Sequence, residues 1–250
     1  MKDKPLRVNE AAVSFGATEV FRDLSLEICR SEFVAVVGPS GCGKTTLLNL
    51  LSGFLKPSAG TVTRVGRVRM VYQHESLFPW QTASQNIALG LRDLSNEAER
   101  EQQLGEMLRL VKLEEFAGHY PHQLSGGMRQ RVELARALAG DTDILLLDEP
   151  FSSLDYLTRL RLRRELARML EEFPRTVVLV THDIEEAAQL ADRILVLSDR
   201  PAHIRRELRV EIPRPRELTH PGVVETVHAI LAEFGLEQDT VLNPPPLGRG

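Results

Sequence analysis

A glycine-rich loop between an apolar run and a helical pattern narrows the possible folds of this chain more than any other feature. The run Phe33 to Val37 is apolar and β-branched, as in a buried strand, and it ends at Gly38. Lys44 to Leu51 then carries apolar residues at helical spacing. The loop reads Gly38-Pro39-Ser40-Gly41-Cys42-Gly43-Lys44-Thr45. A strand, a glycine loop and a helix in this order predict an α/β protein whose loop surrounds a phosphate group.

Further apolar runs of strand length alternate with helical patterns in the second half of the chain. The expected strands are Ile144 to Leu147, Thr176 to Val180 and Ile194 to Leu197, and the expected helices are Tyr156 to Glu172 and Ile184 to Leu190. This alternation predicts a mostly parallel sheet that is covered on both faces.

Two other regions have a different pattern. Leu6 to Phe15 and Val20 to Ile28 are strand-like and are joined by a short turn, which predicts an antiparallel flank. From about Asn86 to Ala139 we find helical patterns and turns but no strand, which predicts an inserted helical lobe. Within it, one helical face is formed by Leu104, Met107, Leu108 and Val111.

Composition and charge exclude several classes of protein. Of the 250 residues, 42% are hydrophobic and 26% are charged, which is close to the globular average. The net charge is -4 and no block of Lys and Arg occurs, so we expect no nucleic-acid partner. We expect no signal peptide, because Met1 to Glu10 contains charges and a proline where an apolar core is needed. We expect no membrane span, because no stretch of about 18 apolar residues occurs. Cys29 and Cys42 are expected to be free thiols in a reducing cytosol.

The loop fits the phosphate-binding pattern G-x-x-x-x-G-K-[ST]. Its glycines allow consecutive backbone N–H groups to turn toward phosphate oxygens, and the following helix adds its positive end. Lys44 can reach the β- and γ-phosphates, and the Thr45 hydroxyl can bind Mg²⁺. We expect Gly38, Pro39, Ser40, Gly41, Cys42, Gly43, Lys44, Thr45 and Thr46 to form the nucleotide-binding segment.

A second motif supplies two adjacent carboxylates. The apolar run that starts at Ile144 ends in Asp148-Glu149-Pro150, at the end of a strand where open α/β sheets bind their ligands. Asp148 fits an Mg²⁺ ligand, and Glu149 fits the general base that takes a proton from water. The phosphate loop alone does not decide the class of nucleotide-binding protein, because small-molecule kinases and GTPases also contain such a loop.

A third motif, Leu124-Ser125-Gly126-Gly127-Met128-Arg129-Gln130-Arg131, precedes a helical pattern and resembles the signature of ABC-type ATPases. Three further elements of that family are present in the same order. Gln73 follows the strand-like Val68 to Tyr72, Asp155 closes the loop Ser152-Ser153-Leu154-Asp155, and His182 follows an apolar run. A phosphotransferase would have no evident use for the signature or for His182.

The resemblance implies a P-loop NTPase (RecA-like) core with a mostly parallel sheet, an antiparallel β flank and a helical subdomain inserted at about 86–139. It implies an ATPase domain over residues 1–205. The Pro-rich stretch around Asn243 predicts that the extension over 206–250 is partly flexible. Three positions depart from the usual family pattern: Phe15 replaces a tyrosine, Ser31 replaces a glycine, and Thr61 to Arg69 is shorter than the usual hairpin.

The resemblance also assigns roles. ATP and Mg²⁺ are the implied cofactors. Glu149, His182 and Lys44 are the implied catalytic residues, and Thr45, Gln73 and Asp148 the implied metal ligands. Phe15 would stack on adenine. The residues Gln73, Leu124, Ser125, Gly126, Gly127 and Asp155 would also contact nucleotide. The signature, an anion-binding helix start, would contact the γ-phosphate held by another copy, so that a homodimer encloses ATP.

Asp199-Arg200-Pro201 and Phe78-Pro79-Trp80 resemble segments of importer ATPases for nitrate, sulfonates, taurine and related small anions. This resemblance implies a peripheral protein at the cytoplasmic face of the cell membrane, a transmembrane permease as partner and, indirectly, an extracytoplasmic solute-binding protein. Two alternatives stay open: a soluble ABC ATPase without a transport role, and an importer ATPase for another solute. A long heptad run or a tandem cassette would favour the first, and the chain has neither.

Overall fold

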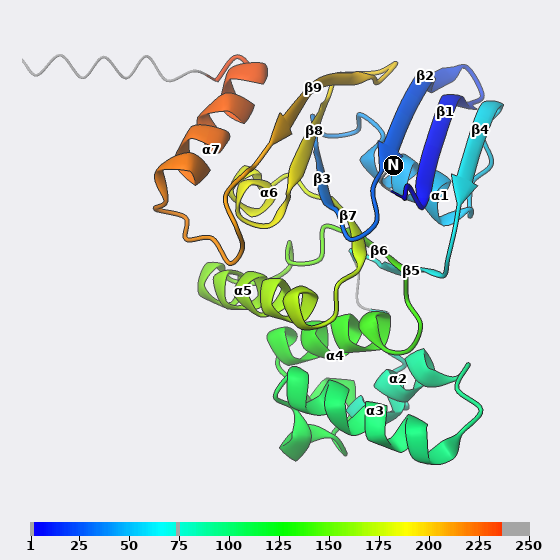
Figure 1. Cartoon of the computed structure of the whole chain (residues 1–250), viewed down its shortest axis with the longest axis vertical. Coiled ribbons are helices and arrows are strands. Elements are labelled where there is room, and N and C mark those ends of the chain that lie inside the picture. Colours follow the sequence, from blue (N-terminus) through cyan, green and yellow to red (C-terminus); the bar gives the residue numbers. More distant parts are fainter. Residues whose placement is uncertain (1–2, 74–75, 237–250) are drawn as a thin grey trace, which may run out of the picture.

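Six strands form the central sheet, in the order β5-β6-β7-β3-β8-β9 (Figure 1). The structure is a computed structural model that describes residues 3–73 and 76–236. The strands are β3 (Phe33–Val37), β5 (Val68–Val71), β6 (Ile144–Asp148), β7 (Thr176–Val180), β8 (Arg193–Leu197) and β9 (Ile204–Arg209). All neighbours are parallel except β8 and β9. The predicted mostly parallel sheet is confirmed.

Side chains of the central strands alternate between two hydrophobic cores, one on each face of the sheet. On β3, for example, Ala35 faces one core, whereas Val34 and Val36 face the other. Every residue of β3, β6 and β7 is buried, which explains why these strands appear in the sequence as uninterrupted apolar runs.

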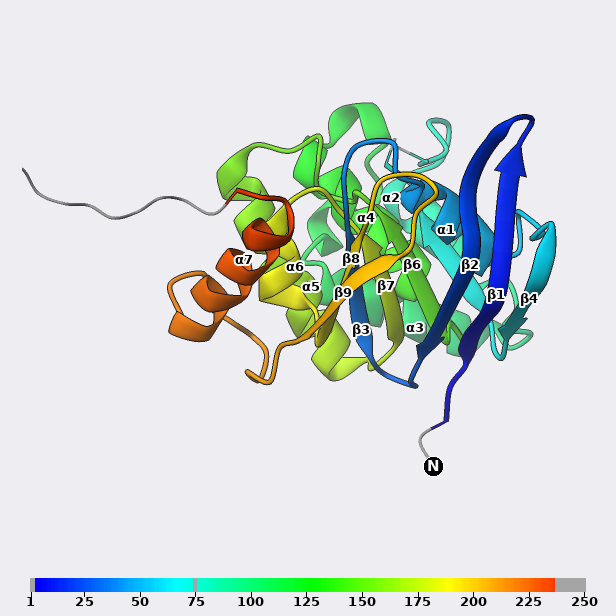
Figure 2. The ribbon, with the colours of Figure 1, turned by 90° about the horizontal axis from the view of Figure 1, so that it is seen from above.

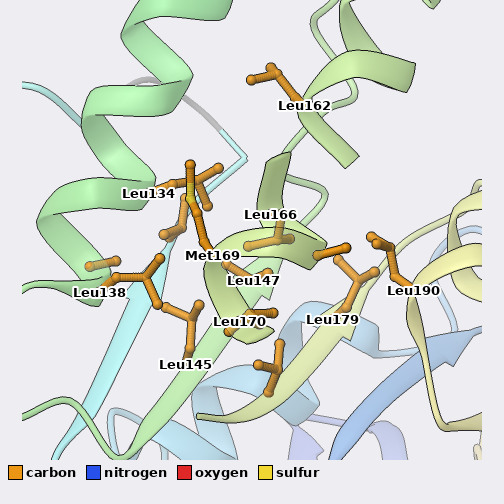
Figure 3. Packing of buried hydrophobic residues seen from close by; sticks show 14 of the residues in the cluster. Leu134, Leu138, Leu145, Leu147, Leu162, Leu166, Met169, Leu170, Leu179 and Leu190 are labelled. Carbon is orange, nitrogen blue, oxygen red and sulfur yellow. The ribbon is translucent and has the colours of Figure 1, made fainter. Parts of the chain in front are cut away.

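The first core lies between the sheet and a layer of helices. This layer contains α4 (Gly126–Leu138), α5 (Tyr156–Glu172) and α6 (Ile184–Leu190). Figure 3 shows Leu147 of β6 packed with Leu166 and Met169 of α5. The predicted helices 156–172 and 184–190 are confirmed at both ends. Asp155 and Asp183 begin them by capping backbone N–H groups.

The second core is closed by α1 (Lys44–Ser52) and by a smaller antiparallel sheet. This sheet has the order β2-β1-β4, with β1 (Leu6–Phe15), β2 (Thr18–Ile28) and β4 (Ala59–Arg64). Figure 2 shows it beside α1, at the edge of the molecule away from α7. The predicted antiparallel flank is confirmed.

Thr61 to Arg69, the stretch that is shorter than the usual hairpin, does not form a hairpin in this structure. Strand β4 pairs with β1, whereas β5 pairs with β6, so the two segments belong to different sheets. The chain crosses between the sheets at Gly66, whose φ is 105°. A Cβ at this position would lie 2.5 Å from a carboxylate oxygen of Asp143, so glycine fits this crossing. Ser31, which replaces a glycine of the usual family pattern, has a left-handed φ of 59°. Glycine adopts this conformation at no steric cost.

The predicted helical lobe is confirmed between β5 and β6, and it lies at the bottom of Figure 1. It contains α2 (Ala83–Ala88), η1 (Leu89–Leu91), α3 (Glu97–Leu110), η2 (Glu114–Phe116), η3 (Pro121–Gln123) and α4, and its described residues form no strand. Met107, Leu108 and Val111 are buried, and Leu104 packs against them. The helical face predicted from spacing is therefore the face that enters the core.

After β9 the chain forms α7 (Pro221–Glu233), which packs against α6. The expected division at residue 205 falls within β9 and stays a prediction, and the Pro-rich stretch around Asn243 lies outside the described residues. Among the described residues, no helix combines the length and the apolar character that a membrane crossing requires.

Candidate functional site

The glycine loop after β3 has a backbone that glycine alone adopts easily. Gly41 and Gly43 have φ values of 77° and 119°. A Cβ on Gly43 would lie 2.5 Å from Cγ1 of Val20, and one on Gly38 would lie 2.9 Å from Sγ of Cys42. The loop can therefore take this shape only without side chains at these positions.

Lys44 places its ammonium group inside the curve of this loop. Its Nζ donates hydrogen bonds to the carbonyl oxygens of Gly38 at 2.9 Å and Pro39 at 3.0 Å. Ser40 and Thr45 remain exposed, whereas Thr46 is half-buried. Cys42 is buried, and burial raises the pKa of its thiol. Its backbone N–H donates to the Pro39 carbonyl at 3.3 Å.

Asp148, at the end of β6, contacts the last residue of this loop motif. The Thr45 hydroxyl donates to Oδ1 of Asp148 at 3.3 Å. Burial raises the pKa of Asp148, while the hydrogen bond from Thr45 acts in the opposite direction. The Thr45 hydroxyl and the Asp148 carboxylate are both oxygen ligands of the kind that Mg²⁺ prefers.

Glu149 gathers two other predicted residues. Its Oε2 accepts a hydrogen bond from Nε2 of Gln73 at 3.0 Å and lies 3.0 Å from Nδ1 of His182. These residues follow β5 and β7, the strands on either side of β6. The backbone of Glu149 is left-handed, with a φ of 46°, and its N–H still donates to the Val180 carbonyl. This conformation is costly for a side-chain residue and is typical of functional sites.

The signature and Asp155 form a second group, at the start of two adjacent helices. Ser125 caps α4 by accepting from the N–H of Met128, and Asp155 caps α5 by accepting from the N–H of Thr158. A Cβ on Gly127 would lie 2.8 Å from Cγ2 of Thr158, so the two helix starts are in close contact. Both capping residues are exposed.

The remaining predicted residues lie apart from these groups. Gly126 is half-buried near Leu154, and Leu124 is buried in the first core, so its side chain does not face solvent. Phe15 lies at the tip of the β1–β2 hairpin and is 55% exposed. One face of its ring is thus free to stack on a planar group.

Comparison with known families decides what this arrangement belongs to. The family profile for ABC transporters matches residues 21–152, which is more than half of the chain. The chain belongs to the ABC transporter family. It is an ATP-binding cassette of that family and an ATPase.

Curated relatives cover most of this ABC cassette. It is 46% identical over 219 residues to the nitrate import ATP-binding protein NrtC of Synechococcus elongatus, covering 83% of the cassette but 33% of that protein. It is 43% identical over 240 residues to an aliphatic sulfonates import ATP-binding protein, SsuB 1, of Agrobacterium fabrum, covering 95% of the cassette and 82% of that protein. It is 44% identical over 238 residues to the taurine import ATP-binding protein TauB of Rhizobium johnstonii, covering 90% of each.

A solved structure shares the fold of the cassette. The dimeric structure of MJ0796, a bacterial ABC transporter cassette, superimposes with a TM-score of 0.71 at 32% identity, over 83% of this chain and 100% of that chain. The predicted α/β architecture with its helical insertion is therefore the fold of an ABC cassette.

Sequence reasoning missed a buried charged cluster behind His182. Arg163 is fully buried and makes an ion pair with Asp183, and Glu186 is buried beside them. Arg163 is one of several arginines on a helix with an otherwise polar surface, so its sequence context does not distinguish it. A three- or four-residue offset from the buried Leu166 and Ala167 is the only indication that it faces inward.

Glu186 makes stability depend on pH. Burial raises the pKa of Glu186 from 4.5 to about 7, partly opposed by Arg163. The native state binds this proton more tightly than the unfolded chain does. The resulting stabilisation of the native state is complete below pH 4.5 and is lost as the pH rises through about 7. Glu186→Gln removes this titration. We therefore expect its free energy of unfolding, relative to that of wild type, to rise by about 2–3 kcal/mol when the pH is raised from 5 to 8, as measured by urea unfolding at each pH. A difference that is equal at both pH values would contradict this titration.

Proposed function

We propose that the cassette hydrolyses Mg-ATP in sites shared by two copies of the chain, and that this drives import of a small anionic solute through a separate membrane permease. The observation that carries the proposal is the division of the predicted residues into two groups. One group surrounds the glycine loop, and the other is exposed at the starts of α4 and α5.

The residues around the loop fit a nucleotide phosphate chain with Mg²⁺. The glycines leave a cradle that Cβ atoms would fill, and Lys44 supplies positive charge within it. Thr45, Asp148 and Gln73 offer hydroxyl, carboxylate and amide oxygens as metal ligands. In the described part of the chain, no three His, Cys, Asp or Glu side chains converge on a metal position. Mg²⁺ usually binds one or two protein carboxylates together with phosphate oxygens, which agrees with this donor set.

The contacts of Glu149 suit it to act as the general base of hydrolysis. Its carboxylate would accept the proton of the attacking water, and the bond from Gln73 fixes the direction of that carboxylate. His182 lies 3.0 Å from the same oxygen through Nδ1, which leaves its Nε2 free to contact the transferred phosphate. The bound Mg²⁺ would neutralise phosphate charge, and Lys44 would orient the γ-phosphate.

The second group suits a site in trans. Ser125 and the following glycines form the start of a helix of 13 residues, whose N–H groups can bind a negative charge. Because Ser125 and Asp155 are exposed, a second copy can bring its own loop against them. The dimeric form of the MJ0796 cassette supports this arrangement.

A pair of exposed aromatic rings supports a membrane partner. Phe78 and Trp80 are 42% and 70% exposed, and their ring centroids lie 5.4 Å apart. Phe78 lines a hollow between the main sheet and the helical lobe, whose charged residues are Arg69, Arg92, Asp93, Glu133 and Arg136. We assign this surface to the permease, and we propose that the cassette acts at the cytoplasmic face of the membrane. A solute-binding protein would act on the other side.

The solute assignment rests on the names of the relatives, which are import proteins for nitrate, aliphatic sulfonates and taurine. Each of these solutes carries an oxyanion group. The cassette itself would contact the permease and not the solute, so its own residues do not choose among them.

Deletion of the gene tests the proposed function. We expect uptake of one of radiolabelled nitrate, taurine or an alkanesulfonate to be lost by at least about tenfold, because transport has no other source of ATP energy. The wild-type gene should restore uptake and Lys44→Ala should not. Lys56→Ala, at an exposed lysine, is the matched control and should restore it. Unchanged uptake of all three solutes would contradict the solute class, and a purified chain without ATPase activity would contradict the mechanism.

A further inference from the structure

Asp183, the residue after His182, is held by two arginines of α5. Its Oδ2 accepts a hydrogen bond from Nη1 of Arg159 at 3.1 Å and another from Nη2 of Arg163. Its Oδ1 caps α6 by accepting from the N–H of Glu186 at 3.0 Å, and its own N–H donates to the Thr181 hydroxyl. Burial acts to raise the pKa of Asp183, but Arg163 and these hydrogen bonds outweigh it, so the pKa is lowered. The carboxylate is thus fixed on every side.

Arg159 extends these contacts to the loop that carries Asp155. While Nη1 donates to Asp183, Nη2 donates to the carbonyl oxygen of Leu154 at 3.1 Å. Leu154 directly precedes Asp155. A guanidinium is planar and rigid, so its two donors move together.

The contacts close a ring that starts and ends at Glu149. Its side chain contacts His182, the next residue is Asp183, and Arg159 joins Asp183 to Leu154. From there the Leu154 N–H donates to the Phe151 carbonyl, and the Ser152 N–H and hydroxyl both donate to the Glu149 carbonyl. Displacement of the Asp183 carboxylate would therefore act on the Asp155 loop through Arg159, unless a hydrogen bond of this ring breaks.

We propose that Arg159 is a positioning residue that couples the His182 loop to the Asp155 loop through Asp183 and the Leu154 carbonyl. The inference rests on the proposed roles of Glu149 and His182, and it adds a route by which the state of the catalytic carboxylate reaches the exposed loop facing the second copy. Arg159 touches neither nucleotide nor water in this role. It acts on the geometry of residues that do.

Steady-state kinetics of the full chain test the link. We expect Arg159→Met, which keeps the aliphatic stem but loses both donors, to lower kcat at least about fivefold while KM for ATP stays within about twofold. Arg159→Lys, which keeps the charge and one donor group, should lose less. Arg161→Met is the matched control on the same helix, at an exposed position, and should match wild type. Thermal unfolding of each variant separates a loss of coupling from a loss of fold.

A double-mutant cycle with Asp183→Asn tests the route. Asparagine can still cap α6 through its carbonyl oxygen, but the NH2 group that then faces the arginines cannot accept a hydrogen bond from them. If Arg159 acts through Asp183, Arg159→Met should cause no more than about a twofold further loss in that background. A kcat of Arg159→Met equal to that of Arg161→Met, or an undiminished loss in the Asp183→Asn background, would overturn the proposal. Two outcomes separate the two levels: a wild-type chain without ATPase activity would contradict the proposed function itself, whereas normal turnover by His182→Ala would contradict only the role of His182 on which this inference rests.

Discussion

Glu149→Gln is expected to lose at least about 100-fold in ATP turnover while it retains ATP binding, because an amide cannot accept the proton of the attacking water. Glutamine has nearly the same shape as glutamate, and it can occupy the left-handed position at residue 149 as the glutamate does. Its amide oxygen can still accept a hydrogen bond from Gln73 or from His182. The variant should therefore keep the shape of the site and lose its chemistry.

Trapping of nucleotide gives this prediction a second readout. A variant that binds ATP but does not hydrolyse it should accumulate as an ATP-dependent dimer in size-exclusion chromatography, with wild type remaining mostly monomeric after turnover. Glu171→Gln, an exposed acid on α5, is the control for removing one negative charge. Normal steady-state hydrolysis by Glu149→Gln would show that this residue is not the base.

Much of the fold could be predicted because its central strands are buried on both faces. Strands β3, β6 and β7 contain only buried residues, so each is a short continuous apolar run that ends where a motif begins. Helix α5 could be predicted at both ends because Asp155 supplies a cap and the apolar positions recur at helical spacing. The convergence of the motif residues could also be predicted, because the ends of parallel strands meet at one edge of the sheet.

The features that could not be predicted depend on contacts between distant parts of the chain. The separation of β4 and β5 into two sheets is fixed where the N–H of Arg67 donates to Asp143, 76 residues away. The ion pair of Arg163 depends on how α5 meets α6, and the left-handed backbone of Glu149 depends on the bond to Val180. Local spacing indicates at most that Arg163 faces inward, and it does not identify the distant partner in any of these contacts.

The proposed trans arrangement makes a prediction that no single-chain site can imitate. Lys44→Ala removes the ammonium group from the glycine loop. Ser125→Arg places bulk and positive charge at the exposed start of α4, where the γ-phosphate of the second copy would bind, and also removes the α4 cap. Each change should disable one half of a composite site.

Two mixed dimers contain these same two changes in different arrangements. In the first, one chain carries Lys44→Ala and its partner carries Ser125→Arg. Both defects then fall in one ATP site, and the other site combines an intact loop with an intact signature. In the second, one chain carries both changes and its partner is wild type, so each site has one defect. The two dimers have identical composition, which controls for general destabilisation.

Trapped ATP distinguishes the two arrangements better than hydrolysis, because hydrolysis can require both sites to act together. Each mixed dimer would be isolated through two different affinity tags, incubated with radiolabelled Mg-ATP and freed of unbound nucleotide. We expect the first arrangement to retain about half of the wild-type amount, from its one intact site, and the second to retain almost none. If retention were equal in the two arrangements, or greater in the second, the loop and the signature would act within one chain, and the exposed helix starts of α4 and α5 would need another function.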